Sequence, residues 1–165
     1  MDMQVVMHYI HIYGLIVLFI IVVGEYSIPG IPPGIVMPAA GIMAGRAHKG
    51  LFLVIFISLI AGLVGSIALY TVGYYVGSPL LEKIEKRFPK TKKPIERTQD
   101  ILEKHDFIGI FICRLIPIVR TLVSAIAGSI KMDCFKFVLF SIPGIFCWNL
   151  SGIVVGYFFG GTLLS

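Results

Sequence analysis

Charged side chains are scarce in this 165-residue sequence. Only 14% of its residues are Asp, Glu, Lys or Arg, whereas 57% are hydrophobic and the mean hydropathy is +0.93. A soluble domain of this size could not bury so much apolar surface, so the composition predicts an integral membrane protein. The apolar segments are long and do not alternate with a period of two, which excludes a membrane β-barrel and predicts an all-α fold.

Cysteine and histidine are also rare. Cys113, Cys134 and Cys147 are odd in number and form no C-x-x-C pair, which argues against a disulfide framework or a thiolate metal site. We expect them to be buried as small apolar residues. His48 and His105 lie far from the arginines of the apolar segments, and no Ser-His-Asp order or metal-ligand spacing occurs. The sequence therefore predicts no enzyme, no metal and no cofactor.

The few charges are concentrated in one segment. Eight of the 14 Lys and Arg and six of the nine acids fall within residues 78–106. By the positive-inside rule, this segment is predicted to be a cytoplasmic, solvated and partly helical connector. The net charge of +5 is better explained by contact with anionic lipid headgroups than by nucleic acid, which we do not expect as a partner.

Two segments, 50–77 and 135–164, exceed the roughly 20 apolar residues that a membrane-spanning helix needs. The other apolar stretches are interrupted. Residues 13–24 precede Glu25 and a segment rich in Pro and Gly, and residues 107–113 precede Arg114. Each predicts a helix that enters the membrane, breaks near its middle and returns to the same side, a re-entrant hairpin of the kind that forms binding sites. The residues expected at the two breaks are Pro32, Pro33, Gly34 and Pro117.

An internal repeat gives the arrangement of these segments. A shift of 87 residues superposes 28–78 on 115–165 and aligns Ala40 with Ala127, Gly41 with Gly128 and Tyr70 with Tyr157. Each copy contains one hairpin and one spanning helix, an odd number of crossings, so the second copy must be inverted. We predict a single membrane domain, 1–165, with repeat 1 at about 13–78, the connector at 78–106 and repeat 2 at about 100–165.

Arg114 and Arg120 are the most informative pair, because they lie six residues apart in an apolar run with Pro117 between them. A charge in the bilayer costs at least ~2.5–3.5 kcal/mol, so such residues usually line a polar pathway or bind an anion. The alternative is that both snorkel to headgroups. A guanidinium binds phosphate oxygens bidentately, and a helix that starts after Pro117 would add its positive dipole end. The pair predicts a site for a phosphate-bearing lipid near the membrane midplane.

Glu25 is the acid expected at the tip of the first hairpin, facing the arginines if the hairpins face each other. It could keep the empty site neutral as a counter-ion, or exchange a proton during transport. The alternative is a local cap-like or interfacial acid near Tyr26 and Ser27.

Several of these residues together resemble a known family. The second half carries the motif R-x-x-P-x-x-R-T from Arg114 to Thr121, followed by Ala127-Gly128, Trp148 and Gly156-Tyr157. Through these residues the chain resembles the DedA family, also called the VTT-domain proteins. The resemblance covers about residues 24–160. The resemblance implies two facing re-entrant hairpins in the bacterial cytoplasmic membrane and lipid transport or scrambling, with Arg114, Arg120 and Thr121 as the phosphate-binding residues. It implies undecaprenyl phosphate as the transported lipid, with phosphatidylethanolamine as an alternative.

The chain departs from the family pattern at three places. Many members have an acid at the position of Ile35 and an Asp at the position of Ser66, which leaves Glu25 as the candidate for proton coupling here. Longer members also continue past the position of Gly160 into another membrane helix. A chain that lacks these acids could prefer a different lipid, so phosphatidylethanolamine remains an alternative substrate. A third interpretation is a membrane scaffold that transports nothing.

Glycines recur at small-xxx-small spacing in both long apolar segments. Such faces allow helices to approach closely, so we expect them to pack against the hairpins or against a second copy of the chain in a homodimer. The glycines concerned are Gly62, Gly65, Gly73 and Gly77, and Gly152, Gly156 and Gly160.

Overall fold

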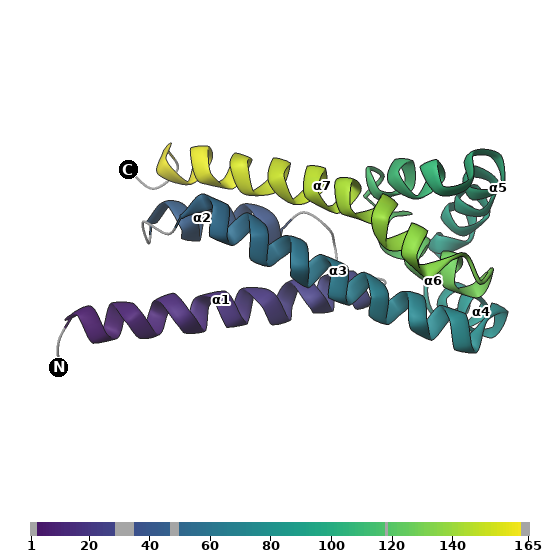
Figure 1. Cartoon of the computed structure of the whole chain (residues 1–165), viewed down its shortest axis with the longest axis horizontal. Coiled ribbons are helices and arrows are strands. Elements are labelled where there is room, and N and C mark those ends of the chain that lie inside the picture. The colour runs from purple at the N-terminus through teal and green to yellow at the C-terminus, as the bar shows by residue number, and fades with distance from the viewer. Residues whose placement is uncertain (1–2, 29–34, 47–49, 118, 163–165) are drawn as a thin grey trace.

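The computed structural model describes residues 3–28, 35–46, 50–117 and 119–162, and this part of the chain contains helices and no strands (Figure 1). The elements are α1 (Met3–Ser27), α2 (Val36–Arg46), α3 (Leu51–Val76), α4 (Ser78–Arg87), the short 3-10 helix η1 (Pro89–Thr91), α5 (Lys92–Arg114), α6 (Val119–Ser129) and α7 (Cys134–Thr162). Of the described helices, α3 and α7 are long and apolar enough to cross a membrane, with mean hydropathies of 2.7 and 1.9. The all-α prediction is confirmed, and both predicted spans are helices of sufficient length and apolarity.

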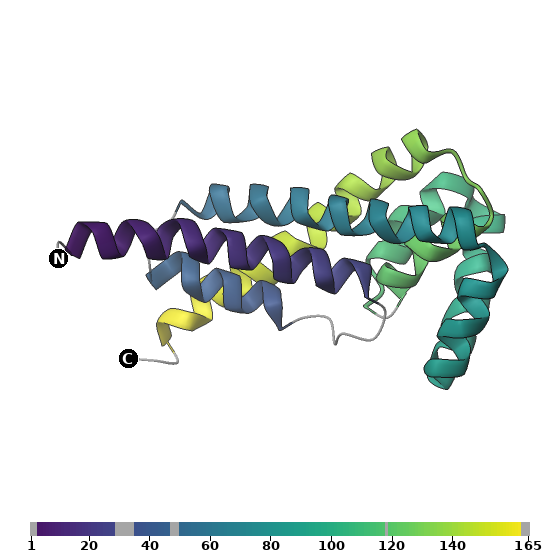
Figure 2. The ribbon, with the colours of Figure 1, turned by 90° about the horizontal axis from the view of Figure 1, so that it is seen from below.

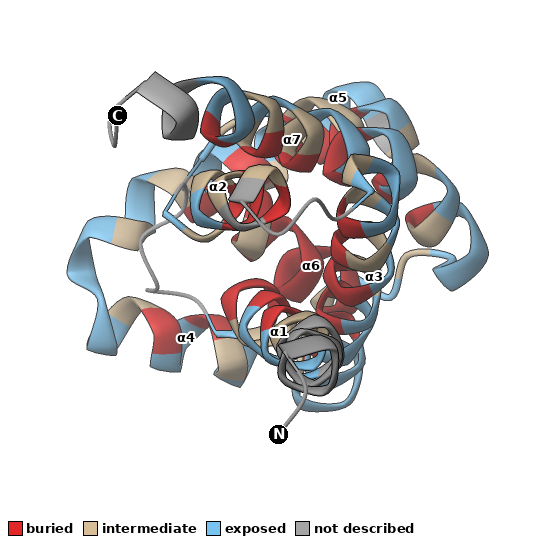
Figure 3. Cartoon of the chain, turned by 90° about the vertical axis from the view of Figure 1, so that its left-hand side faces the viewer, coloured by how far each residue is buried: buried red, intermediate tan, exposed pale blue. Residues whose placement is uncertain are grey.

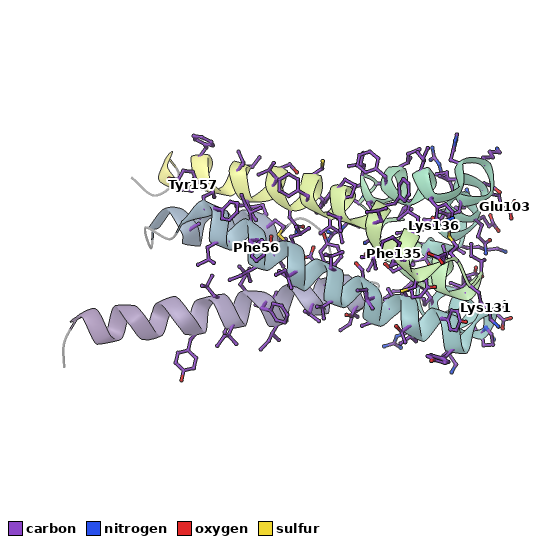
Figure 4. All side chains as sticks on the ribbon, in the orientation of Figure 1. Phe56, Glu103, Lys131, Phe135, Lys136 and Tyr157 are labelled. Atoms are coloured by element: carbon purple, nitrogen blue, oxygen red, sulfur yellow. The ribbon has the colours of Figure 1, made fainter. Side chains whose placement is uncertain are left out.

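The helices form an elongated bundle with distinct ends (Figures 1 and 2). Helices α3 and α7 run in opposite directions along most of its length. Helix α1 runs from one end toward the middle, and α2 returns to that end. Helices α4, α5 and α6 lie at the opposite end. Charge follows the same division, because Glu103, Lys131 and Lys136 gather at the end formed by α4 and α5, whereas Phe56 and Tyr157 lie along the apolar part (Figure 4).

The first interrupted stretch is more helical than expected. Helix α1 begins at Met3 and continues through Glu25 to Ser27, because the chain holds no Pro before position 29. The expected break residues Pro32, Pro33 and Gly34 lie outside the described residues. In the second stretch, Pro117 lies in the turn between α5 and α6, as predicted.

Helix α5 joins the connector to the second apolar stretch but is bent sharply between them. A Cβ added to Gly109 would lie 2.9 Å from the carbonyl oxygen of Ile101. Eight residues of straight helix would separate these positions by about 12 Å, so the helix must fold back on itself between them. The bend falls where the sequence predicts the connector to end, at about residue 106.

The two halves of the chain interlock, because the short second helix of each half packs on the long helix of the other. Helix α2 lies against α7, and α6 lies against α3, while α1 also packs on α3. Glycines allow the close approach. A Cβ added to Gly156 would overlap the Pro38 carbonyl oxygen, and one added to Gly73 would overlap that of Ala125. The prediction that glycine faces pack against the shorter helices is confirmed at these positions.

Gly77 has a different role from the one expected. Nothing lies within 4 Å of a Cβ added there, but its φ of +66° is a conformation that favours glycine. It turns the chain sharply from α3 into α4, with its N–H bonded to the Gly73 carbonyl (2.8 Å).

Buried side chains form two apolar clusters along the bundle. One joins α3, α4, α5, α6 and the start of α7, and the other joins α1, α2, α3 and the later part of α7. Viewed along the bundle, the inner surfaces of α3, α6 and α7 are buried (Figure 3). The cysteine prediction is wrong in part: Cys113 is buried, but Cys134 and Cys147 are exposed, and all three are free thiols.

Candidate functional site

The sequence-predicted charges meet where the two halves of the chain come together. Arg114 is the last residue of α5, Arg120 is the second residue of α6, and Glu25 lies in the last turn of α1. All three side chains are buried, each residue being only 1% exposed. The alternatives of snorkelling arginines and an interfacial glutamate are therefore wrong for this structure, because none of the three reaches the surface.

Arg120 connects the second half to the first through an ion pair. Its Nη2 donates to Oε1 of Glu25, 95 positions earlier in the chain. Its guanidinium carbon also lies over two aromatic rings, 4.6 Å from the centroid of Tyr26 and 4.9 Å from that of Trp148. Cation–π contacts of this kind are strongest when, as here, the cation is removed from water.

Arg114 has no carboxylate partner among the described residues. Its Nη1 donates to the Arg120 carbonyl (3.2 Å), and its Nη2 donates to Ser124 Oγ (3.2 Å) and Ser141 Oγ (2.9 Å). These bonds tie the end of α5 to α6 and to α7, around the break at Pro117. The Arg120 N–H donates to the Ile116 carbonyl (2.9 Å), so this group at the start of α6 already has a partner.

Two residues of α7 accommodate the Arg114 side chain in the core. A Cβ added to Gly144 would lie 2.6 Å from the Arg114 Cβ, so α7 can pass the arginine only because this residue lacks a side chain. The guanidinium carbon of Arg114 also lies 5.5 Å from the centroid of Phe137, one turn before Ser141 on the same helix.

A second polar network holds Tyr26 against Arg120. The Tyr26 hydroxyl donates to Asn149 Oδ1 (2.8 Å), and Asn149 Nδ2 donates to the carbonyl (3.1 Å) and hydroxyl (3.3 Å) oxygens of Ser58. All three residues are buried, so the network joins α1, α3 and α7 beside the ion pair. Removing one member would leave a buried polar atom without its partner.

We expect Tyr26→Phe to lower the stability of the protein by about 1 kcal/mol, because it keeps the ring over Arg120 but removes the hydrogen bond to Asn149. Thermal unfolding of the detergent-purified protein measures the change. Tyr75→Phe is the matched control, because Tyr75 is 82% exposed. Equal losses in the two variants would mean that the Tyr26–Asn149 bond does not hold the helices together.

The site carries an excess positive charge. Glu25 is the only acid among the buried residues that the structure describes, and it stands against two guanidiniums. Four buried polar atoms have no hydrogen-bond partner in this part of the chain: Glu25 Oε2, Arg114 Nε, and Arg120 Nε and Nη1. Buried polar groups are rarely left unpaired, so three unused N–H donors beside an uncompensated charge favour the binding of an oxyanion.

The remaining predicted positions lie outside this cluster. Thr121 is half-buried on α6 and makes no hydrogen bond to either arginine within the described residues. At the two positions where many family members carry acids, Ile35 is 67% exposed and Ser66 is buried, its hydroxyl donating to the Gly62 carbonyl (2.6 Å). No group of three or more His, Cys, Asp or Glu that could hold a metal ion occurs in the described part of the chain.

Sequence reasoning missed Ser124, Ser141 and Tyr26, which contact the arginines, and it missed Asn149 and Ser58, which hold Tyr26 in place. A hydrogen bond from Asn149 to another helix could have been predicted, because a buried amide in the middle of a 29-residue apolar helix is expected to find a partner on a neighbouring helix. The serines and the tyrosine carried no such signal, since these residues also occur in membrane helices without a site.

Comparisons with known proteins identify one family model and several relatives. Residues 28–158 match the model of the VTT domain. The chain is 28% identical to undecaprenyl phosphate transporter A of Staphylococcus aureus over 157 residues, which cover 93% of the chain and 77% of that protein. It is 29% identical to Protein DedA of Escherichia coli strain K12 (87% of the chain, 68% of that protein). It is 31% identical to an alkaline phosphatase-like protein of Lactococcus lactis subsp. lactis (85% of the chain, 67% of that protein). No solved structure matches it.

Proposed function

This chain belongs to the VTT-domain family, the DedA proteins, and on that basis we propose that it transports a phosphate-bearing lipid between the leaflets of the bacterial cytoplasmic membrane. The first candidate substrate is undecaprenyl phosphate, which a relative from Staphylococcus aureus is named for transporting. Phosphatidylethanolamine is the second. The protein is proposed to cross the membrane several times and to act without enzymatic chemistry.

The proposed architecture is a pair of re-entrant hairpins, α1–α2 and α5–α6, in an inverted repeat. It is supported by matching contacts in the two halves. Pro38 on α2 and Ala125 on α6 are 87 positions apart, and they meet Gly156 and Gly73, which are 83 positions apart. The separations of 87 and 83 positions differ by four residues, which is about one helical turn. Residues one turn apart lie on the same face of a helix, so corresponding faces make the contact in both halves.

The observation that carries the proposal is the buried charge excess at Arg114, Arg120 and Glu25. A phosphate monoester would bring negative charge and several acceptor oxygens to a site with three unpaired guanidinium nitrogens. Because the site lies between the tips of the two proposed hairpins, separation of the hairpins on one side or the other would open it to one leaflet at a time.

The contacts of the two arginines suggest different roles. Arg114 is held by three hydrogen bonds to α6 and α7, so it is suited to stay in place as the fixed half of the phosphate site. Arg120 has one charged partner, Glu25, and two unpaired nitrogens. We propose that the phosphate displaces Glu25 from Arg120 during transport, so that the glutamate acts as an exchangeable counter-ion.

The test is transport by the purified protein in liposomes. Tail-labelled polyprenyl phosphate and tail-labelled phosphatidylethanolamine are each placed in the bilayer, and the fraction in the outer leaflet is followed by a membrane-impermeant quencher. We expect faster exchange of the polyprenyl phosphate with protein than without it. Equal rates with and without protein for both lipids would reject transport and favour a membrane scaffold. Release of inorganic phosphate would favour an enzyme.

Arg114→Gln should slow this exchange by about 10- to 100-fold, because it removes a charged hydrogen-bond donor that is worth about 1.5–3 kcal/mol. Arg87→Gln is the matched control, because Arg87 is an exposed cation of α4 outside the site. Equal slowing by both substitutions would indicate a general effect of charge on the protein in the membrane rather than binding at the buried site.

A further inference from the structure

An apolar groove separates the two helices of the first half. It has a volume of about 250 Å³ and is lined on one side by Gly14, Leu18 and Ile21 of α1, and on the other by Ile35, Ala39 and Ala40 at the start of α2. The groove exists because α1 packs on α3 and α2 packs on α7, so the two helices contact each other only sparsely. Small residues on both walls keep it open.

The groove lies on the same face of α1 as the buried ion pair. Gly14, Leu18, Ile21 and Glu25 follow one another at intervals of four, three and four residues, which places them on one face of α1. Glu25, the partner of Arg120, therefore lies one helical turn beyond the end of the groove. An apolar groove one helical turn from the proposed phosphate site matches the chemistry of a phospholipid or polyprenyl phosphate, whose charged head is attached to a hydrocarbon chain.

The walls of the groove are suited to a hydrocarbon chain in the membrane. Ile35 is 67% exposed and Ile21 is 48% exposed, so the groove opens sideways on the outer surface of the helices. No charged side chain lines it. A chain could lie there while its head is at the arginines, and it could enter from the bilayer without crossing a polar surface.

We infer that the groove between α1 and α2 holds the hydrocarbon chain of the phosphate-bearing lipid while its phosphate is bound at Arg114 and Arg120. This inference rests on the proposed function and adds a tail-binding subsite to it. The groove then contributes to specificity by the length and shape of the chain, whereas the arginines recognise the head.

The test fills the groove without disturbing the core. Ala39 is exposed on α2, so Ala39→Phe places a large side chain in the groove and not in the packing against α7. Ala68→Phe is the matched control, because Ala68 is an equally small, exposed residue on α3 and does not line the groove. Thermal unfolding of both variants checks that they fold.

Two probes separate the tail from the head. We expect Ala39→Phe to slow the exchange of a long-chain polyprenyl phosphate at least tenfold, and to leave the affinity for butyl phosphate, which has the same head and almost no tail, unchanged. Ala68→Phe should alter neither. Wild-type exchange in Ala39→Phe, or an equal loss of both probes, would overturn the inference.

Photolabelling tests the subsite without depending on transport. A polyprenyl phosphate with a diazirine in its chain should label residues 13–28 and 35–46 in the wild type and in Ala68→Phe, and much less in Ala39→Phe. Labelling without any lipid exchange would support the groove while contradicting the proposed function. Exchange without labelling, or equal labelling by a diazirine phosphatidylcholine, would reject the groove as the specific tail site. A change of oligomeric state in Ala39→Phe with unchanged labelling would instead identify the groove as a contact between two copies of the chain.

Discussion

Replacing Arg120 with methionine is expected to abolish lipid exchange and to destabilise the protein by about 3–5 kcal/mol. The loss of stability follows because Glu25 would remain buried and charged without its partner, which is the usual effect of breaking a buried ion pair from one side. The loss of exchange follows because Arg120 supplies two of the three unpaired guanidinium nitrogens of the proposed phosphate site. Thermal unfolding and the liposome assay measure the two effects separately.

The double variant Arg120→Met/Glu25→Leu separates folding from function. Apolar residues of similar volume often replace a buried ion pair without loss of stability, so this variant should regain most of the stability. It should nevertheless remain inactive, because the cation that binds phosphate is still absent. Exchange at the wild-type rate in the double variant would show that Arg120 does not bind the lipid. An equally stable single variant would show that the ion pair contributes nothing to the fold.

The second large effect is expected at the contact between α2 and α7. Gly156→Ala should lower stability by about 3 kcal/mol, the upper end of the usual range for overpacking, because the new Cβ would overlap the Pro38 carbonyl. The overlapped atom belongs to the backbone, so the helices must separate rather than a side chain rotate. Thermal unfolding in detergent measures the loss.

Gly24→Ala is the matched control for this prediction. Gly24 also lies inside a helix, α1, but nothing lies within 4 Å of a Cβ added there. Alanine favours the helix more than glycine does, so this variant should be as stable as the wild type or slightly more stable. If Gly156→Ala unfolded at the same temperature as Gly24→Ala, the contact between α2 and α7 would have to be looser than the structure describes.

The sequence predicted the long apolar helices and the charged residues that interrupt apolar runs. The two spans were predicted from uninterrupted apolar runs, and Arg114, Arg120 and Glu25 were found because charges within such runs require an explanation. Glu25 was expected to face the arginines only if the two hairpins face each other, and which arginine it pairs with could not be derived, because sequence spacing does not fix which residues of two distant segments meet.

Other features depend on tertiary packing and left little trace in the sequence. The bend of α5 lies between Ile101 and Gly109, where no proline marks it. The groove between α1 and α2 arises from the spacing of two helices that pack on different neighbours, a distance that no local pattern encodes. The roles of Ser124 and Ser141 depend on the position of Arg114 relative to two other helices.

The interlocking of the halves also has a consequence during translation. Helix α2 emerges from the ribosome early, but α7, on which it packs through Gly41 and Gly156, is made only after α3, α4, α5 and α6. At usual elongation rates the delay is on the order of 10 s. During that time the nascent N-terminal segment, including the lone carboxylate of Glu25, has to be sheltered by lipid, water or the insertion machinery rather than by its final neighbours.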